Sequence, residues 1–234
     1  MGKTIHLLSG GAAQGLVAGS KVGFAASHGA DVQGTFGAVG AMRDKLLAGE
    51  PCDVVILTQA LIEQLAADGH VDGKTVTPLG LVKTGVAVKD GEPHPDTSTA
   101  ASLKAALQGA SAIYFPDPVK ATAGIHFMEV MKSLGVDVEL ASSFKSFPNG
   151  AAAMRAMAQD AGKGAIGCTQ VTEILFAPGV ELAGLLPTEF ELATVYTAGV
   201  ATKAQDPQAA REFIAMLSGE EAAALRKSGG FEPL

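Results

Sequence analysis

Two segments near the start of the chain combine a predicted strand, a glycine-containing turn and a predicted helix. Residues 4–8 read as a strand that leads into Ser9-Gly10-Gly11, and residues 32–36 lead in the same way into Gly37-Ala38-Val39. The first turn of an α-helix exposes backbone N–H groups and the positive end of the helix dipole, so it binds anions without Lys or Arg. The spacing therefore predicts a small-anion cradle at one edge of a sheet. The alternative is a pair of ordinary α/β turns that bind no ligand.

Further hydrogen-bonding side chains fall where predicted strands end. They are Thr58, Gln59, Asn149, Thr169 and Gln170. Hydroxyl and amide groups at these places can donate hydrogen bonds to the oxygens of an anion. We therefore expect the ligand to be held by neutral donors as well as by helix starts.

The composition excludes several classes of partner. Nucleic-acid binding needs clustered Lys and Arg, whereas the formal net charge is −7, and the absence of Trp argues against stacking on bases or sugars. Cys52 and Cys168 have no metal-ligand spacing and the histidines are scattered, so we expect no metal and no cofactor. No run of 18 apolar residues occurs, so we expect no membrane insertion.

The start of the chain leaves its compartment open. No signal-peptide pattern follows Met1. We expect a periplasmic protein if a signal peptide has been removed, and a cytoplasmic protein otherwise.

Predicted strands and helices alternate along the whole chain, which indicates an α/β fold with largely parallel strands. Strands are expected at 4–8, 32–36, 53–57, 79–89, 112–115, 136–141, 164–168 and 190–202. Helices are expected at 12–28, 41–47, 58–68, after Ser98 or Thr99, at 125–134, 150–159 and 169–173, and from 206 to 227. The extended stretches 79–89 and 190–202 fit two hinge strands, with lobe one formed by 1–80 plus 200–234 and lobe two by 85–190. A ligand cleft is then expected where the carboxyl ends of the strands converge.

The order of these motifs resembles the periplasmic molybdate-binding protein family, which has the type 2 periplasmic-binding-protein fold. The resemblance covers nearly the whole chain. It rests on the turns at 9–12 and 36–42, on the segment 47–55, on Asp117-Pro118 with Ala123-Gly124, and on 158–167. It implies a two-lobe α/β protein that closes on a small anion and, if the protein is exported, an ABC transporter permease as partner.

The departures from this family favour a different anion. Family members have a hydroxyl residue in the second turn, where this chain has Ala38 and Val39, and they tend to have a Tyr near Cys168 and Thr169. Ser9 alone remains as an oxyanion-type hydroxyl. Because each unpaired oxygen in a dry site costs about 1–3 kcal/mol, we expect a di- or tricarboxylate in preference to molybdate.

The resemblance also leaves an enzyme open, because aconitate isomerases are similar in sequence to molybdate-binding proteins. Their reaction is a 1,3-proton shift, which needs a base, an acid and donors for the carboxylates. His126 is the expected base and Lys120 the expected carboxylate partner, with Cys168 as a further acid–base group if its thiol pKa is lowered. The alternatives are a packing or surface His126, a solvated Lys120 and a small buried Cys168.

These arguments define two sets of expected ligand-binding residues. Lobe one is expected to supply Ser9, Gly10, Gly11, Gly37, Ala38, Val39, Thr58 and Gln59, and lobe two Lys120, His126, Asn149 and Thr169.

Overall fold

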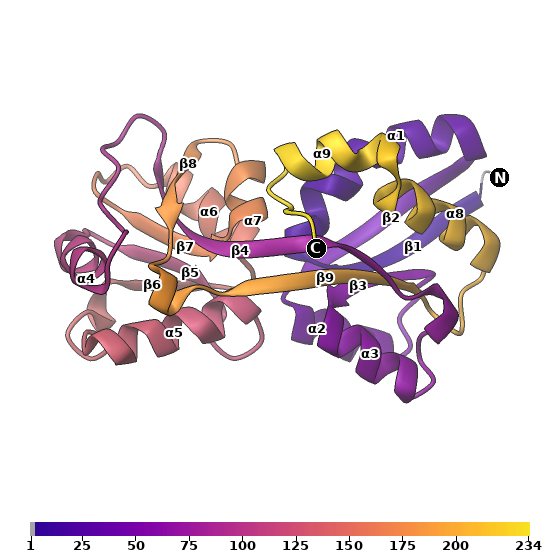
Figure 1. Ribbon diagram of the computed structural model, residues 1–234, viewed down its shortest axis with the longest axis horizontal. Coiled ribbons are helices and arrows are strands. Elements are labelled where there is room, and N and C mark those ends of the chain that lie inside the picture. Colours follow the sequence, from indigo (N-terminus) through magenta and orange to yellow (C-terminus); the bar gives the residue numbers. More distant parts are fainter. Residues whose placement is uncertain (1–2) are drawn as a thin grey trace. The chain divides into compact units, whose positions relative to one another are not determined.

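The computed structural model describes residues 3–234, and Figure 1 shows its elements. The chain forms two compact units. Unit 1 contains the residues up to Val82 together with Thr194–Leu234, and unit 2 is Lys83–Ala193. The long strand β4 (Thr77–Lys89) passes from unit 1 into unit 2, and β9 (Ala193–Val200) begins at the other boundary. A hinge role for these two strands stays a prediction.

Unit 1 is a sheet of mainly parallel strands covered by helices. Strands β1 (Lys3–Gly10), β2 (Ala30–Gly37) and β3 (Val54–Thr58) are parallel, and β9 pairs antiparallel with β3. The helices are α1 (Gln14–His28), α2 (Val39–Leu47), α3 (Gln59–Ala67), α8 (Pro207–Ser218) and α9 (Ala223–Ser228). Figure 1 shows α1, α8 and α9 on one side of the strands and α2 with α3 on the other.

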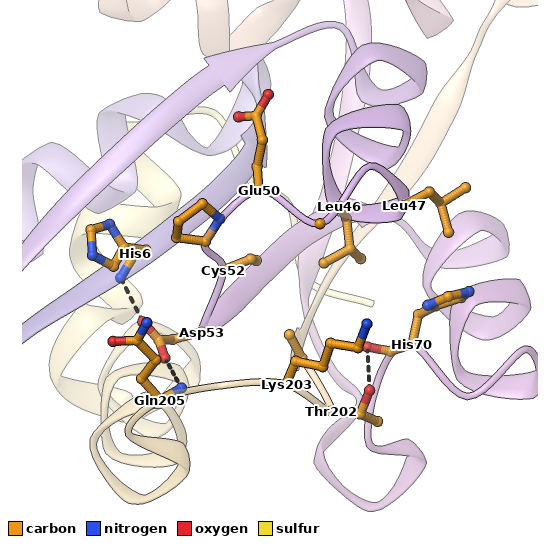
Figure 2. A pocket seen from close by; sticks show the side chains of 13 residues that line it. His6, Leu46, Leu47, Glu50, Cys52, Asp53, His70, Thr202, Lys203 and Gln205 are labelled. Carbon is orange, nitrogen blue, oxygen red and sulfur yellow. Dashed lines mark hydrogen bonds between the residues drawn. The ribbon is translucent and has the colours of Figure 1, made fainter.

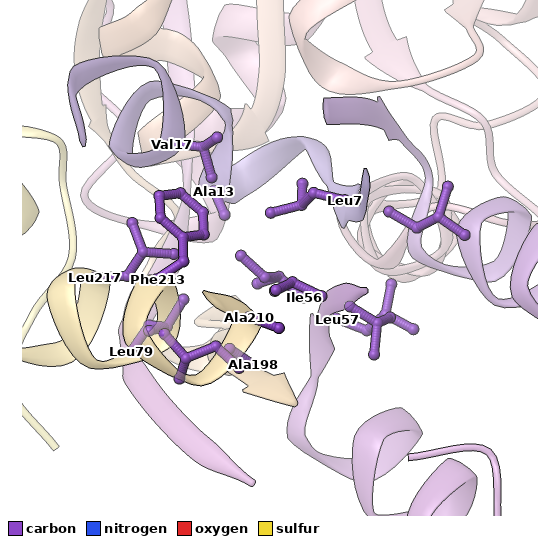
Figure 3. Close-up of a cluster of buried hydrophobic side chains, with 14 of the residues drawn as sticks. Leu7, Ala13, Val17, Ile56, Leu57, Leu79, Ala198, Ala210, Phe213 and Leu217 are labelled. Carbon is purple, nitrogen blue, oxygen red and sulfur yellow. The ribbon is translucent and has the colours of Figure 1, made fainter. Parts of the chain in front are cut away.

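The core of unit 1 explains why β3 reads as a continuous apolar run. Residues 54–57 of β3 are fully buried, as expected for a strand with helices on both faces. Phe24 of α1 packs edge-on against Phe213 of α8, with ring centroids 4.9 Å apart. Figure 3 shows Phe213 and Leu217 beside strand residues such as Ile56.

Unit 2 has helices on both faces of a second set of strands. Its strands are the second part of β4, β5 (Ile113–Pro116), β6 (Phe144–Phe147), β7 (Ile166–Gln170) and β8 (Val180–Leu185). Its helices are α4 (Ala100–Gly109), α5 (Thr122–Leu134), α6 (Gly150–Gln159) and α7 (Val171–Phe176). Phe127 of α5 shares a cluster with Ile166 and Cys168, whereas Met154 of α6 shares one with Tyr114 on the opposite face. Alternate residues of β7 therefore face different helices.

The predicted alternation of strands and helices is observed, with one wrong strand and two strands, β6 and β8, that the sequence did not predict. Residues 136–141 form no strand; the strand β6 begins only at Phe144. The Leu140 N–H donates to the Val136 carbonyl at 2.9 Å, and both side chains are buried on the same side. The apolar residues of this segment therefore belong to a helix-like turn and not to the predicted strand. Within residues 3–234, no helix is long and apolar enough to cross a membrane.

A buried carboxylate fixes the start of α6. Glu173 is 5% exposed, accepts the Thr169 hydroxyl at 2.6 Å and accepts the Ala151 N–H at 3.2 Å. A Cβ atom at Gly150 would lie 2.0 Å from Glu173 Oε2, so only glycine allows this approach. Burial raises the pKa of Glu173, and the hydrogen bonds from Thr169 and the α6 backbone oppose that rise.

The start of α5 is fixed by an equally close contact. A Cβ atom at Gly124 would lie 2.3 Å from the Pro116 carbonyl oxygen and 2.4 Å from that of Asp117. These are backbone atoms, which cannot rotate aside. We predict that Gly124→Ala lowers the free energy of unfolding by about 1–3 kcal/mol, as overpacking does.

Urea unfolding measures this, with Gly23→Ala as the control. Gly23 lies within α1 and has open space where a Cβ would go, so its replacement should be neutral or stabilise the protein by up to about 1 kcal/mol. Equal stability of Gly124→Ala and wild type would contradict this packing.

A second prediction concerns the pH dependence of stability. A raised pKa means that the folded state binds the Glu173 proton more tightly than the unfolded state does. The associated stability is therefore complete below the ordinary glutamate pKa and is lost as the pH rises through the folded value. We predict that wild type loses stability relative to Glu173→Gln as the pH rises from the ordinary glutamate pKa to the folded-state pKa of Glu173, by up to about 1.4 kcal/mol for each pH unit between the two.

Urea unfolding at several pH values tests this, and the exposed Glu221→Gln is the control. If the free energy of unfolding changed with pH in the same way in wild type and Glu173→Gln, Glu173 would not be a source of the pH dependence.

Candidate functional site

Three helix starts meet at one edge of the unit 1 sheet. Because β1, β2 and β3 are parallel, their carboxyl ends at Gly10, Gly37 and Thr58 lie at the same edge. The short 3-10 turn Gly11–Ala13 and α1 follow β1, while α2 and α3 follow β2 and β3. This edge is where an α/β sheet binds ligands.

None of these helix starts is capped by a side chain. The residues Gly10, Ala13, Ala38 and Thr58 at the N-cap positions make no side-chain cap hydrogen bond. Thr58 lies at the expected change from strand to helix, but its hydroxyl does not cap α3. We call such a helix start open.

The pattern of capping separates this edge from the rest of the chain. Among the described helices of nine or more residues, α4, α6 and α8 are capped by the side chains of Thr99, Asn149 and Asp206. Helices α1, α2, α3 and α5 are open. Since an uncapped first turn exposes N–H donors and positive potential, the open helix starts are the places where an anion gains most.

At this edge Gly10 has little room for a side chain. The neighbouring Ser9 hydroxyl is already hydrogen-bonded within the protein. A Cβ at Gly10 would lie 2.8 Å from Val39 Cγ1 and 3.0 Å from Tyr196 Cε1. Ser9 is fully buried, and its hydroxyl donates to the Gly10 carbonyl at 2.8 Å. Ser9 therefore has no hydrogen left to donate to an oxyanion in this arrangement. Gln59 donates to Glu63 at 2.7 Å along the exposed side of α3.

In unit 2 the predicted loop leads into the open start of α5. Asp117 Oδ1 accepts the N–H groups of Val119 and Lys120, which shapes the loop before α5. The Lys120 side chain is exposed. His126 Nε2 lies 2.8 Å from the Phe190 carbonyl oxygen. A carbonyl only accepts, so Nε2 holds a hydrogen and Nδ1 is the ring nitrogen that can take a proton.

Two other predicted residues are engaged within the protein. Asn149 caps α6 by accepting the Ala152 N–H at 2.8 Å, and the Thr169 hydroxyl donates to Glu173. The α6 start is thus closed by a side-chain amide and a carboxylate. A ligand role for Asn149 or Thr169 stays a prediction, and it would require these hydrogen bonds to be exchanged.

In the described part of the chain, four buried side chains have polar atoms without hydrogen-bond partners, and three of these residues were not selected from the sequence. Among the described residues, both polar atoms of the Gln170 amide and the hydroxyls of Thr84, Thr172 and Thr197 have no hydrogen-bond partner, although all four side chains are buried. Such groups are rare because each costs free energy. Of the four, only Gln170 was expected as a donor. Thr84 and Thr197 lie within apolar strands, where nothing in the local pattern distinguishes them.

Neither cysteine has the environment of a reactive thiolate. Both are buried and free. Burial raises the pKa of the Cys52 thiol to about 12, and burial also raises that of Cys168. The condition set for an acid–base role of Cys168, a lowered thiol pKa, is therefore not met, and the alternative of a small buried residue fits its burial.

A separate pocket of about 210 Å³ lies at the other end of the unit 1 strands. Figure 2 shows His6, His70 and Lys203 among the side chains around it. The carboxylate of Asp53 in this region accepts the backbone N–H groups of His6 and Gln205. None of the expected ligand-binding residues lines this pocket, and no group of metal-ligating side chains occurs within residues 3–234.

Comparisons with known proteins agree with this architecture. An aconitate isomerase from Pseudomonas sp. is 27% identical over 198 residues, which is 83% of this chain and 72% of that protein. The structure of the periplasmic molybdate-binding protein of Azotobacter vinelandii matches with a TM-score of 0.82 at 18% identity, over 98% of this chain and 99% of that one.

Two further structures have the same fold. The sulfate-binding protein SubI from Mycobacterium tuberculosis matches with a TM-score of 0.75 at 18% identity, over 99% of this chain and 87% of its own. PEB3 of Campylobacter jejuni, solved with L-phospholactate, matches with a TM-score of 0.71 at 16% identity, over 98% and 100%. The expected type 2 periplasmic-binding-protein fold is confirmed. The family model described as bacterial extracellular solute-binding protein matches residues 5–232, so the chain belongs to that family.

Proposed function

We propose that this solute-binding protein takes up a small di- or tricarboxylate. The observation that carries the proposal is the distribution of caps. The helices that begin at the carboxyl ends of β1, β2 and β3, and α5 in unit 2, are open, whereas α4, α6 and α8 are closed by their own side chains. An anion is the ligand that open helix starts favour.

The net charge of the chain indicates that an anion is held by local hydrogen-bond donors and is not drawn in by the overall electrostatic field. The net charge of −7 repels anions from a distance. The expected residues of unit 1 include no Lys or Arg, so the backbone N–H groups supply the favourable potential there. This suits an anion whose charge is spread over several carboxylates, each meeting a different helix start.

The side chains at the unit 1 edge disfavour molybdate and sulfate. A tetrahedral oxyanion needs donors to all its oxygens, and each one left unpaired costs about 1–3 kcal/mol. Ala38 and Val39 have no hydroxyl, and the Ser9 hydroxyl donates to Gly10. PEB3 with L-phospholactate is an example of this fold binding an anion that has a carboxylate as well as a phosphate. A periplasmic location and an ABC transporter permease partner belong to the same proposal.

We expect citrate, tricarballylate, malate or succinate to raise the melting temperature more than molybdate or sulfate does. A ligand present at 100 times its dissociation constant stabilises the folded state by about 2.7 kcal/mol. Thermal unfolding across this panel measures the effect. A large shift with molybdate and none with any carboxylate would overturn the proposal.

A second candidate function is isomerisation of an unsaturated tricarboxylate. It is favoured by the 27% identity to an aconitate isomerase over most of the chain. The proposed base is His126 through Nδ1, because Nε2 is held by the Phe190 carbonyl, and the open start of α5 would stabilise developing negative charge. Lys120 is the proposed partner for a substrate carboxylate.

Incubation with cis- or trans-aconitate in deuterated water, followed by proton NMR, tests this second function. An isomerase should convert the substrate and incorporate deuterium, and His126→Asn should lose activity by about 10²–10⁴-fold. The exposed His94→Asn, in the same unit, is the control and should retain activity. Binding without exchange would leave solute binding as the function.

A further inference from the structure

Gln170 is a buried side chain whose amide makes no hydrogen bond within the described part of the chain. It ends β7 and is 2% exposed, yet neither Nε2 nor Oε1 has a hydrogen-bond partner among residues 3–234. Exchanging the amide oxygen and nitrogen would not change this, because both are unpaired. A buried primary amide needs an acceptor for its N–H groups and a donor for its oxygen.

The position of Gln170 on β7 places it on the α5 face of the sheet. Side chains alternate along a strand, and Cys168, two residues earlier, packs with Phe127 of α5. Strands β5 and β7 are parallel, so Gln170 and the end of β5 at Pro116 lie at the same edge. The open start of α5 packs on Pro116 through Gly124.

Two hydroxyls accompany Gln170. Thr84 is its directly paired residue across the antiparallel β4–β7 ladder, and paired residues point to the same face. Thr172 lies two residues further along, in the first turn of α7. Both hydroxyls are buried and unpartnered among the described residues. The strand pairing thus places the Thr84 hydroxyl beside Gln170, and the open start of α5 follows the strand next to β7.

The amide oxygen of Gln170 constrains the ligand. At neutral pH carboxylate, sulfate and molybdate oxygens only accept hydrogen bonds, so they can satisfy Nε2 but not Oε1. A hydroxyl next to a carboxylate supplies a donor beside an acceptor, which matches both ends of the amide. We infer that the ligand is a hydroxycarboxylate whose hydroxyl donates to Gln170. This inference rests on the proposed carboxylate-binding function and narrows it.

Isothermal titration with ligand pairs that differ by one hydroxyl tests the inference. The pairs are citrate with tricarballylate, malate with succinate, and lactate with propionate. For the pair that binds, we expect wild type to prefer the hydroxylated member by roughly 10- to 100-fold, the range for a buried group left unpaired. Gln170→Leu should reduce that preference to less than about threefold.

The surface variant Gln208→Leu, on α8, is the matched control and should keep the wild-type preference. Equal binding of both members of a pair by wild type would overturn this inference while the carboxylate proposal stands, even if Gln170→Leu fails to fold. A preference that persists in folded Gln170→Leu would also overturn it. Failure of every carboxylate to bind would overturn the inference together with the proposed function.

Discussion

The structure depends on how the N–H groups at the start of each helix are satisfied. A helix start inside a protein needs acceptors, which come from a capping side chain, from water or from a ligand. This chain uses Thr99, Asn149 and Asp206 for α4, α6 and α8, and uses no side chain at α1, α2, α3 and α5. The open helix starts follow strands that end at one edge of each unit, so within each unit taken by itself the local capping pattern and the sheet topology indicate the same edge.

In unit 2 one helix start already binds a carboxyl group of the protein itself. The α6 start holds the carboxylate of Glu173, which accepts the Ala151 N–H and the Thr169 hydroxyl. The geometry is that of a carboxyl group accepting hydrogen bonds at a helix start, with glycine at position 150 to allow the approach. The open start of α5 lacks such an internal acceptor from a capping side chain. A carboxylate ligand at the open starts would use the same chemistry that the protein already uses at α6.

The sequence predicted the parts of this account that depend on neighbours along the chain. The change from strand to helix periodicity at Gly10, Gly37 and Thr58 is local, and so is the helix start at 150. Residues 136–141 are expected as a strand but form a turn, because the Leu140 N–H bonds back to the Val136 carbonyl and both side chains are buried. Glu173 and Thr84 could not be identified, because their environments are made by Gly150 and Gln170, which lie far from them along the chain.

Amide chemical shifts test the central claim most directly. The account predicts that titrating ¹⁵N-labelled protein with its best carboxylate ligand moves the backbone amide signals of the first turns of α1, α2, α3 and α5. The first turns of the capped helices α4, α6 and α8 should move little. Large changes at the capped helix starts or around His6 and His70, with none at the open helix starts, would contradict it.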